Sequence, residues 1–317
     1  MKTDISVIIP VYNGAKTIED CLTSVLRAPP LAKKTIVVDN NSNDNTRKIV
    51  RRFKNVKLLI EKKRGPAAAR NKGLKETNCE IAIFVDADVI VKRNTFIDLL
   101  KHIRARSIAG VGGIAESYDR HNSISLSQDI RLFGNSVFDT KVKKVNHIPT
   151  MIVAYRTKII KELGYFNEDY YPSGEDVDLN YRIRKAKYTL LISPLSRVYH
   201  NHPISIKGLI NKWFHYGVGW AKLCMEHNKY FALSSSILWI VAVFILFISF
   251  FVKKGLLPAF LLVLMLPWVI YYSIPTLKYL VIKRDARAFL FPFIHQIQIF
   301  ARSIGVLYGA LIGSLGF

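Results

Sequence analysis

The sequence predicts an α/β protein built on an open, mostly parallel sheet with helices on both faces, followed by an α-helical transmembrane region. Three observations support this fold class. Apolar runs of strand length alternate with helical patterns over the first 115 residues, as in sheets built from strand–helix units. The apolar run 81–85 ends in two aspartates, Asp86 and Asp88. Beyond residue 230 the chain has seven basic residues and one acid, Asp285.

Hydrophobic periodicity places the elements of the first part in order. Ile18, Cys21, Leu22 and Val25 fall on one face at helical spacing after Gly14. Strands are predicted at 5–9, 35–38, 56–60 and 81–85, and helices after Gly14, around residues 49–53 and over 67–76. Ligands of such sheets bind at the carboxyl ends of the strands. The polar residues at those ends are therefore expected to meet in one cleft: Asn13, Asp39, Asp86 and Asp88.

The strand at 81–85 ends in a pair of carboxylates one residue apart. Strand geometry points Asp86 and Asp88 to the same side, where like charges repel unless a cation lies between them. Mg²⁺ or Mn²⁺ binds one or two carboxylates together with the oxygens of a diphosphate. The alternative is a solvated Asp-Ala-Asp turn without a metal.

Two uncharged runs, 234–252 and 255–277, are each long enough to cross a bilayer as a helix. Residues 288–317 are a weaker third candidate, because His295, Gln296, Gln298 and Arg302 interrupt the run. Buried core helices are the alternative for the first two. The predicted domains are residues 1–204, the α/β domain that carries the cleft; 205–230, an amphipathic interfacial helix; and 231–317, the transmembrane helices.

Charge distribution predicts a multi-pass protein of the cell membrane with a cytoplasmic N-terminal domain. No signal peptide is expected at Met1–Asp4, and the basic residues after the second run outnumber Lys253 and Lys254 before it. Three cysteines without a C-x-x-C motif suit a reducing compartment. The net charge of +23 is better explained by anionic lipid headgroups than by nucleic acid, because no nucleic-acid-binding module is recognisable.

The segment Ser205–His227 has one apolar stripe with basic residues elsewhere, which is typical of a helix lying in the membrane interface. Packing of the same helix against the soluble domain is the alternative. Lys212-Trp213 resembles the end of the Gln-x-x-Arg-Trp motif of processive synthases, but Leu209 stands in place of the glutamine. A processive polymerase is therefore disfavoured.

Five motifs in order carry a resemblance to a known family. They are Pro10-Val11-Tyr12-Asn13, Val38-Asp39-Asn40-Asn41-Ser42, Gly65 to Ala69-Arg70-Asn71, Asp86-Ala87-Asp88 and Gly174-Glu175-Asp176-Val177-Asp178-Leu179. Each is weak alone, but together they resemble family 2 glycosyltransferases over roughly residues 5–230. The resemblance implies the nucleotide-diphospho-sugar transferase (GT-A) fold, which is Rossmann-like.

The same resemblance implies roles for the donor-side residues. Asp39 and Arg70 would contact the base of a nucleotide, in a pocket that Pro10, Tyr12 and Asn13 also line. A carboxylate can accept the imide N–H of uracil, and an arginine can donate to its carbonyl or to a phosphate. Asp86 would face the ribose or the metal, and Asp88 would bind the metal. The alternatives are a turn cap for Asp39 and a salt bridge on a helix face for Arg70.

On the acceptor side, the family pattern places the catalytic base at Asp176. A base is needed if a sugar hydroxyl attacks; the alternative is that Glu175, Asp176 and Asp178 cap a helix. His200 resembles the family's third metal ligand, with His202 as the alternative and solvated loop histidines as a third possibility. Lys187 stands where family members usually have glycine.

The sequence therefore predicts a membrane-anchored, inverting, metal-dependent glycosyltransferase of the hexosyltransferase type, acting in cell-envelope glycan synthesis. Its donor would be a nucleotide-diphospho-sugar, with UDP favoured over GDP. Its acceptor would be lipid-linked, either a polyprenyl phosphate or a saccharide hydroxyl. The alternative from another class is a non-catalytic nucleotide-sugar-binding scaffold or sensor in a membrane complex, which would need neither Asp88 nor Asp176.

Overall fold

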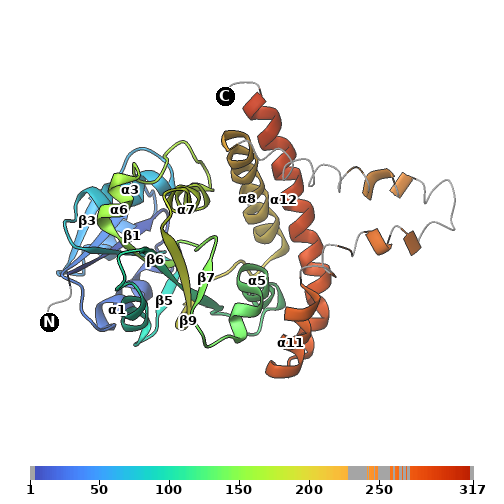
Figure 1. Ribbon diagram of the computed structural model, residues 1–317, viewed down its shortest axis with the longest axis horizontal. Coiled ribbons are helices and arrows are strands. Elements are labelled where there is room, and N and C mark those ends of the chain that lie inside the picture. The colour runs from blue at the N-terminus through green and yellow to red at the C-terminus, as the bar shows by residue number, and fades with distance from the viewer. Residues whose placement is uncertain are drawn as a thin grey trace. The chain divides into compact units, whose positions relative to one another are not determined.

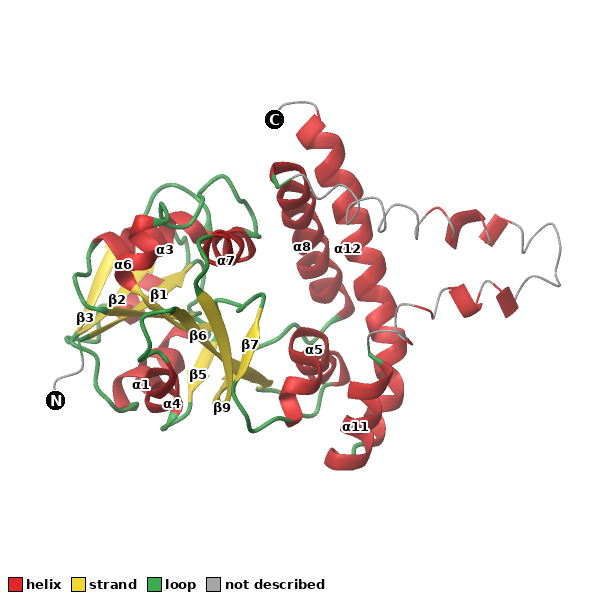
Figure 2. Cartoon of the chain, in the orientation of Figure 1, coloured by secondary structure: helices red, strands yellow, loops and turns green. Residues whose placement is uncertain are grey.

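The computed structural model describes residues 4–227 and 272–314, with isolated positions between 241 and 269. It divides into two compact units, which we describe separately. The sheet unit comprises Met1–Tyr118 and Phe138–Asn201, and the helical unit comprises Asp119–Val137 and His202–Phe317. Figure 1 and Figure 2 show strands in the first unit and helices in the described part of the second.

The sheet unit is built on a nine-stranded mixed sheet. The strand order is β3-β2-β1-β4-β8-β6-β9-β5, with β7 paired to β9. The strands are β1 (Ile5–Val11), β2 (Lys34–Asp39), β3 (Val56–Ile60), β4 (Ile81–Val85), β5 (Val89–Val91), β6 (Ile108–Ser117), β7 (Lys143–Val145), β8 (Ile152–Arg156) and β9 (Thr189–His200). The four strands from β3 to β4 are parallel, as predicted. Strand β8 is antiparallel to both its neighbours, and β5 and β7 are antiparallel to β9.

Helices cover both faces of this sheet, as the alternation of the sequence predicts (Figure 1). The helices are α1 (Ile18–Arg27), α2 (Thr46–Val50), α3 (Pro66–Lys75), α4 (Thr95–His102), α6 (Thr157–Glu162) and α7 (Glu175–Lys185). One continuous apolar core joins α3, α6 and α7 to the face of the sheet that carries Ile8 and Phe84. The predicted apolar face of α1 is fully buried. Helix α2 ends at Val50, so the helix predicted around residues 49–53 stops before Phe53.

Helix α7 ends in a Schellman motif with a lysine at the left-handed position. Lys187 has φ +66°. Its N–H donates to the Arg184 carbonyl at 2.9 Å, and the Tyr188 N–H donates to the Ile183 carbonyl at 3.2 Å. Glycine is the usual residue at this position, because a Cβ in the left-handed region costs roughly 1–2 kcal/mol. The departure from the family pattern at Lys187 is therefore a strained position.

We expect Lys187→Gly to raise the free energy of unfolding by about 1 kcal/mol, because the strain is relieved while the two backbone hydrogen bonds stay. Lys185→Gly is the matched control: this exposed lysine lies in the last turn of α7, where glycine costs about 1 kcal/mol. Thermal and denaturant unfolding of the two variants should therefore move in opposite directions. A loss of stability in both would contradict the assignment of strain to Lys187.

The helical unit contains α5 (Ser123–Phe133), α8 (Ile206–Glu226), α11 (Ser273–Lys283) and α12 (Phe291–Ser314). Two short 3-10 turns accompany them, Ala286–Leu290 and Gly134–Phe138, and the second of these crosses the boundary between the two units. Helices α8 and α12 approach each other closely at glycines. A Cβ on Gly217 would lie 2.0 Å from the Arg302 carbonyl oxygen, and one on Gly305 would lie 2.0 Å from the Phe214 carbonyl oxygen. The two backbones are therefore in direct contact, and a larger residue at either glycine would separate the helices.

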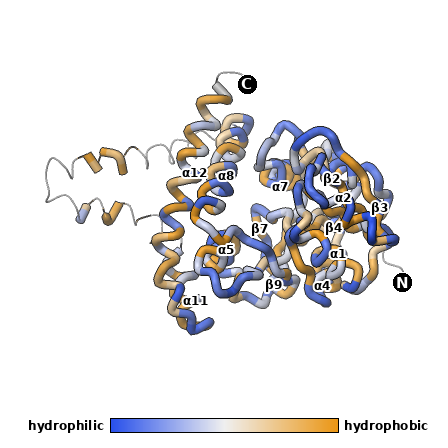
Figure 3. The backbone as a smooth tube through the Cα atoms, turned by 180° about the vertical axis from the view of Figure 1, so that it is seen from behind, coloured by the Kyte–Doolittle hydropathy of each residue, from blue (hydrophilic) through white to orange (hydrophobic). Residues whose placement is uncertain are grey.

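In the described part of the chain, one helix, Ala286–Ile312, is long and apolar enough to cross a membrane, and half of its most apolar stretch is buried inside the structure. Figure 3 shows the hydrophobic residues along α12. This helix overlaps the weakest of the three predicted spans. The runs predicted at 234–252 and 255–277 lie largely outside the described residues. Of the stripe predicted on α8, Leu209, Trp213, Ala221 and Cys224 are buried, whereas Ile206 and Ile210 are exposed.

Candidate active site

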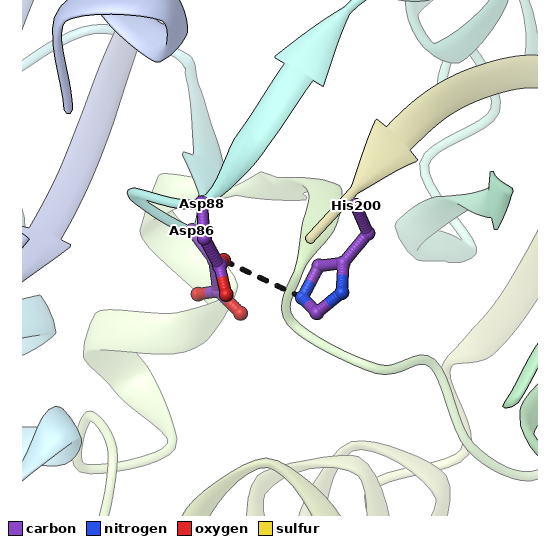
Figure 4. A group of neighbouring side chains, drawn as sticks. All are labelled: Asp86, Asp88 and His200. Atoms are coloured by element: carbon purple, nitrogen blue, oxygen red, sulfur yellow. Dashed lines mark ion pairs between the residues drawn. The ribbon is translucent and has the colours of Figure 1, made fainter. Parts of the chain in front are cut away.

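The two aspartates after β4 lie in a turn that leads directly into β5. The Asp86 N–H donates to the Met151 carbonyl at 3.1 Å, and the Val89 N–H donates to the Asp86 carbonyl at 3.1 Å. Both carboxylates point the same way (Figure 4). The reason differs from the predicted one, since a tight turn and not strand alternation brings them together. Their side chains are 30% and 39% exposed, so solvent and ligands can reach them.

His200 joins this pair from the end of β9. It lies opposite Val89 in the antiparallel β5–β9 ladder, and the Asn201 N–H donates to the Asp88 carbonyl at 3.0 Å. Its Nε2 lies 3.4 Å from Oδ1 of Asp88, and the ring points toward the two carboxylates (Figure 4). His202 lies elsewhere, with its Nε2 3.7 Å from Oδ1 of Asp129. Of the two histidines that the sequence offers, His200 is the one beside the aspartates.

One ligand atom from each of Asp86, Asp88 and His200 lies within 4.8 Å of the other two. Two carboxylate oxygens and one imidazole nitrogen form a suitable partial shell for a Mg²⁺ or Mn²⁺ ion, which prefers six ligands. Three protein ligands leave positions for the oxygens of a diphosphate. The donor set therefore fits a divalent cation bound together with a substrate.

Arg70 of α3 connects this group to the start of α7. Its Nη2 donates to Oδ1 of Asp86 at 2.9 Å, and its Nη1 donates to Oε1 of Glu175. Its side chain is only 5% exposed. Burial alone would lower the pKa of Arg70, but the carboxylates of Asp86 and Glu175 outweigh it and raise that pKa. The salt bridge that was the alternative interpretation of Arg70 is therefore present. The buried guanidinium lies between the carboxylates of Asp86 and Glu175.

Glu175 and Asp176 are adjacent but differently placed. Burial raises the pKa of Glu175 to about 7, against the opposing effect of Arg70 and with a contribution from the Asp176 charge. Asp176 is 19% exposed. Its Oδ1 accepts from the Val177 N–H at 2.8 Å, and its Oδ2 lies 3.8 Å from Nε2 of His147. One oxygen thus accepts from the first turn of the helix, while the other faces a histidine.

A cavity of about 820 Å³ opens at the carboxyl ends of β1 and β4. Its lining includes six of the residues that the sequence singled out: Pro10, Tyr12, Asn13, Arg70, Asp86 and Asp88. The cleft predicted at the strand ends is therefore present. Gly65, which has φ +129° and whose N–H donates to Asn40 Oδ1 at 2.8 Å, also lines it. A residue with a side chain would be strained at this φ.

Asp39 ends β2 and is fully buried, outside the lining of the cavity. Its Oδ2 accepts from the Ser42 N–H at 3.1 Å and lies 2.9 Å from Nε of Arg47. Its Oδ1 has no partner among the described residues. The turn-cap interpretation therefore accounts for one oxygen and leaves the second as an unpaired buried acceptor.

Two side chains at this site were not anticipated from the sequence. Arg64 lies 3.9 Å above the centre of the Tyr12 ring and donates to the Tyr12 hydroxyl at 2.7 Å. Arg64 directly precedes the Gly65 motif, which is a signal that could have found it. His147, which accepts from Nδ2 of Asn180 at its Nδ1 and faces Asp176 with Nε2, lies in no motif. Only the tertiary structure places it there.

Comparison with known proteins shows the family. Residues 6–164 match the model of glycosyl transferase family 2. The chain belongs to this family. Glycosyltransferase AglE of Haloferax volcanii is 30% identical over 253 residues, which are 76% of this chain and 81% of AglE. The pre-mycofactocin glycosyltransferase of Mycobacterium tuberculosis is 28% identical over 242 residues, 71% of this chain and 48% of that protein, so this chain spans about half its length.

A solved structure shares the fold of this glycosyltransferase family 2 member. It is mannosyltransferase PcManGT from Pyrobaculum calidifontis in complex with GDP-Man and Mn²⁺, with a TM-score of 0.64 and 20% identity. The match covers 96% of this chain and 87% of the mannosyltransferase. The GT-A-like fold expected for this family 2 glycosyltransferase is thereby supported.

Glu175 gives this family 2 glycosyltransferase a distinct pH dependence of stability. Because the pKa of Glu175 is raised from 4.5 to about 7 in the folded protein, the free energy of unfolding should fall as pH rises from about 4.5 to 7. Glu175→Gln should remove that slope and gain stability relative to wild type over this range. Melting temperatures measured from pH 4.5 to 8 test this, with the exposed Glu162→Gln as control. A pH-independent difference between Glu175→Gln and wild type would contradict it.

Proposed function

We propose that this protein is a membrane-anchored, inverting glycosyltransferase that uses a nucleotide-diphospho-sugar and Mg²⁺ or Mn²⁺, and transfers a hexose to a lipid-linked acceptor at the cytosolic face. The observation that carries the proposal is the convergence of Asp86, Asp88 and His200 beside a cavity of about 820 Å³ that the two aspartates line. Family membership supports the reaction class.

The donor would bind along the ends of β1 and β2. Pro10, Tyr12 and Asn13 line the cavity that would hold the donor. The unpaired Oδ1 of Asp39 is buried outside that lining, so it would accept the imide N–H of uracil only if donor binding opens the strand end. Arg70, which lines the same cavity, would also contact the donor. A uridine donor is favoured. A guanosine donor is the alternative, because guanine also presents N–H donors and the mannosyltransferase of the same fold was solved with GDP-Man.

Asp88 and His200 would hold the cation, with Asp86 facing it or the ribose. A bound divalent cation supplies charge neutralisation for the diphosphate as the sugar leaves. Asp86 is in turn held by Arg70. This arrangement fixes one carboxylate of the metal group through a buried cation, and Asp88 would supply the second carboxylate.

On the acceptor side, Asp176 would act as the base. In a single in-line attack the acceptor oxygen bonds to C1 of the sugar while the bond from C1 to the diphosphate breaks, so the configuration inverts. If the acceptor is a hydroxyl, its proton passes to Oδ2 of Asp176, the oxygen that faces His147. Arg70 joins Asp86 to Glu175 and thereby ties the donor side to the first turn of α7.

Membrane anchoring is proposed from the C-terminal composition. Helix Ala286–Ile312 has the length and hydropathy of a span, and the apolar runs at 234–252 and 255–277 would supply further spans. The cytosolic orientation follows from the basic residues between 278 and 287.

The test is a transfer assay on detergent-purified protein with radiolabelled UDP- and GDP-sugars, Mn²⁺ or Mg²⁺ and total lipid extract. The proposal expects label in the organic-soluble fraction with one donor class, and none when EDTA is added. Nucleotide-sugar binding without transfer across the panel would instead favour a non-catalytic sensor or scaffold.

A further inference from the structure

A second group of polar side chains lies in the helical unit, far along the sequence from the aspartate motif. It comprises Arg131 of α5 and Arg302, His295 and Gln298 of α12, and we call it the arginine cluster. His295 and Gln298 are fully buried, and the two arginines are mostly buried. The ring of His295 lies 4.9 Å from that of Tyr272, and its Nε2 lies 3.3 Å from the Ser127 carbonyl oxygen. These contacts join α5 to α12.

Among the described residues, Arg131 contacts aromatic rings and has no hydrogen-bond acceptor. Its guanidinium carbon lies 4.4 Å from the centre of the Trp213 ring and 4.6 Å from that of Tyr272. Stacking of this kind uses the faces of the guanidinium and leaves its in-plane N–H groups available. Its Nε is buried without a hydrogen-bond partner in the described part of the chain. Arg131 is therefore positioned to donate to an oxyanion that the protein itself does not provide.

Arg302 of α12 also stacks on an aromatic ring. Its guanidinium carbon lies 4.9 Å from the centre of the Trp220 ring, and the close approach at Gly217 and Gly305 fixes α8 against this part of α12. Within residues 4–227 and 272–314, no ion pair joins a carboxylate to Arg131 or Arg302. Burial, and then the Arg302 charge, lower the pKa of Arg131 to about 9. Two like charges that are buried together cost free energy unless an anion compensates them.

The neutral members of the cluster also lack partners. Both side-chain polar atoms of Gln298 and the Nδ1 of His295 are buried without a hydrogen bond to any described residue. Native proteins rarely leave buried polar atoms unsatisfied, and a group of them indicates a bound water, ion or ligand. The unpaired atoms are two donors, Arg131 Nε and Gln298 Nε2, and two acceptors, Gln298 Oε1 and His295 Nδ1, whose ring donates from Nε2 to the Ser127 carbonyl. The positive charge of the two arginines, for which the described residues provide no counter-ion, is therefore what specifies an anion.

The exposed side of α12 suits a lipid. Large apolar side chains recur at helical spacing on the side away from His295, Gln298 and Arg302, and all are exposed: Phe293, Phe300, Ile304, Tyr308 and Leu311. An ionisable residue in a candidate span that faces the interior of a helical bundle is generally functional. The helical unit thus offers an oxyanion-binding interior and an apolar exterior on the same helix.

We propose that the arginine cluster binds the phosphate or diphosphate group of the lipid-linked acceptor. The proposal rests on the proposed function, because it takes the acceptor class from there, and it adds the site that recognises it. Paired arginines bind phosphate oxygens bidentately. Bulk anionic phospholipid presents the same chemistry, so selectivity between the two lipids is the decisive property.

The test uses the full chain in phosphatidylcholine nanodiscs. Binding of a polyprenyl phosphate, the uncharged polyprenol and phosphatidylglycerol is measured by native mass spectrometry and by tryptophan fluorescence, which Trp213 and Trp220 should report. We expect binding of the polyprenyl phosphate at least 10-fold tighter than of either other lipid. Arg131→Gln and Arg302→Gln should each weaken it roughly 10–100-fold, as expected for loss of a charged hydrogen bond. Arg284→Gln, which removes an exposed arginine, should change it less than twofold.

Stability separates this role from a structural one. Because each substitution removes a buried charge without a counter-ion, the melting temperature without the lipid phosphate should stay the same or rise in Arg131→Gln and Arg302→Gln. A lower melting temperature with unchanged lipid binding would overturn the proposal and leave the arginines as stacking residues. Equal affinity for phosphatidylglycerol would also overturn it. Mn²⁺-dependent binding of UDP and GDP, measured on the same samples, tests the donor site of the sheet unit. If neither nucleotide binds, the proposed function is wrong, whatever the lipid measurements show.

Discussion

Asp88→Ala is expected to reduce glycosyl transfer by about 10³-fold or more while the protein stays folded. Asp88 lies in a turn beside His200 with a side chain that is 39% exposed, so its loss leaves no cavity in the core. Its loss would remove a carboxylate from the metal group, and metal neutralisation of a leaving diphosphate is worth several kcal/mol, with about 1.4 kcal/mol for each tenfold in rate. Transfer rates with saturating Mn²⁺ measure the loss of activity, and circular dichroism and the melting temperature show whether the protein stays folded.

Asp20→Ala is the matched control, because Asp20 is an exposed aspartate on α1 outside the cavity lining. It should leave transfer unchanged. Wild-type activity of Asp88→Ala in the presence of EDTA would exclude the metal from the mechanism.

Asp176→Asn separates the two acceptor classes. Asparagine keeps the size of the side chain and can still accept from the Val177 N–H, but it cannot take a proton. With a hydroxyl acceptor, loss of the general base should lower kcat on the order of 10²–10⁴-fold. With a polyprenyl phosphate the attacking oxygen is already anionic, so the loss should be small. Rates with each purified acceptor, and donor affinity measured separately, make the distinction.

Donor affinity should barely change in Asp176→Asn, because Arg70 bonds to Glu175 and Asp86 and not to Asp176. The neighbouring arginine does not complicate the result, since Arg182 bonds to Asp178 and to the carbonyls of Leu163 and Tyr165. Near-normal turnover with a saccharide hydroxyl would contradict the base assignment and leave Asp176 as a helix cap.

Local patterns predicted much of the sheet unit. The apolar runs at 5–9, 35–38 and 56–60 became parallel strands because each is short, apolar and bounded by turn residues. The strand-end rule brought Asn13 and the aspartates of the 86–88 turn to one cavity. The antiparallel half was not predicted, because β6, β8 and β9 pair across long stretches of chain and leave no periodic signal of their order.

The contacts that organise the candidate site were harder to predict. Arg70 and Glu175 are 105 residues apart, and sequence patterns carry no information on which buried acid an arginine will meet. The position of His147 beside Asp176 could not be predicted for the same reason, because only the tertiary structure brings the two residues together. The side chains of Asp86 and Asp88 were correctly predicted to point to the same side, but for the wrong reason. The prediction assumed strand alternation, whereas a tight turn orients them. Of the arginine cluster, His295, Gln298 and Arg302 were visible in the sequence only as interruptions of an apolar run, and Arg131 was not singled out.

The central claim is a divalent cation held by Asp88 and His200 together with the donor diphosphate. Pulsed electron paramagnetic resonance of protein-bound Mn²⁺ with UDP or GDP tests it without reference to turnover. We predict a ¹⁴N coupling from the His200 imidazole and a ³¹P coupling from the diphosphate, with the ¹⁴N coupling lost in His200→Gln and retained in His202→Gln. A spectrum of hexaaqua Mn²⁺ in the wild-type protein, or a ¹⁴N coupling that survives His200→Gln, would contradict the account.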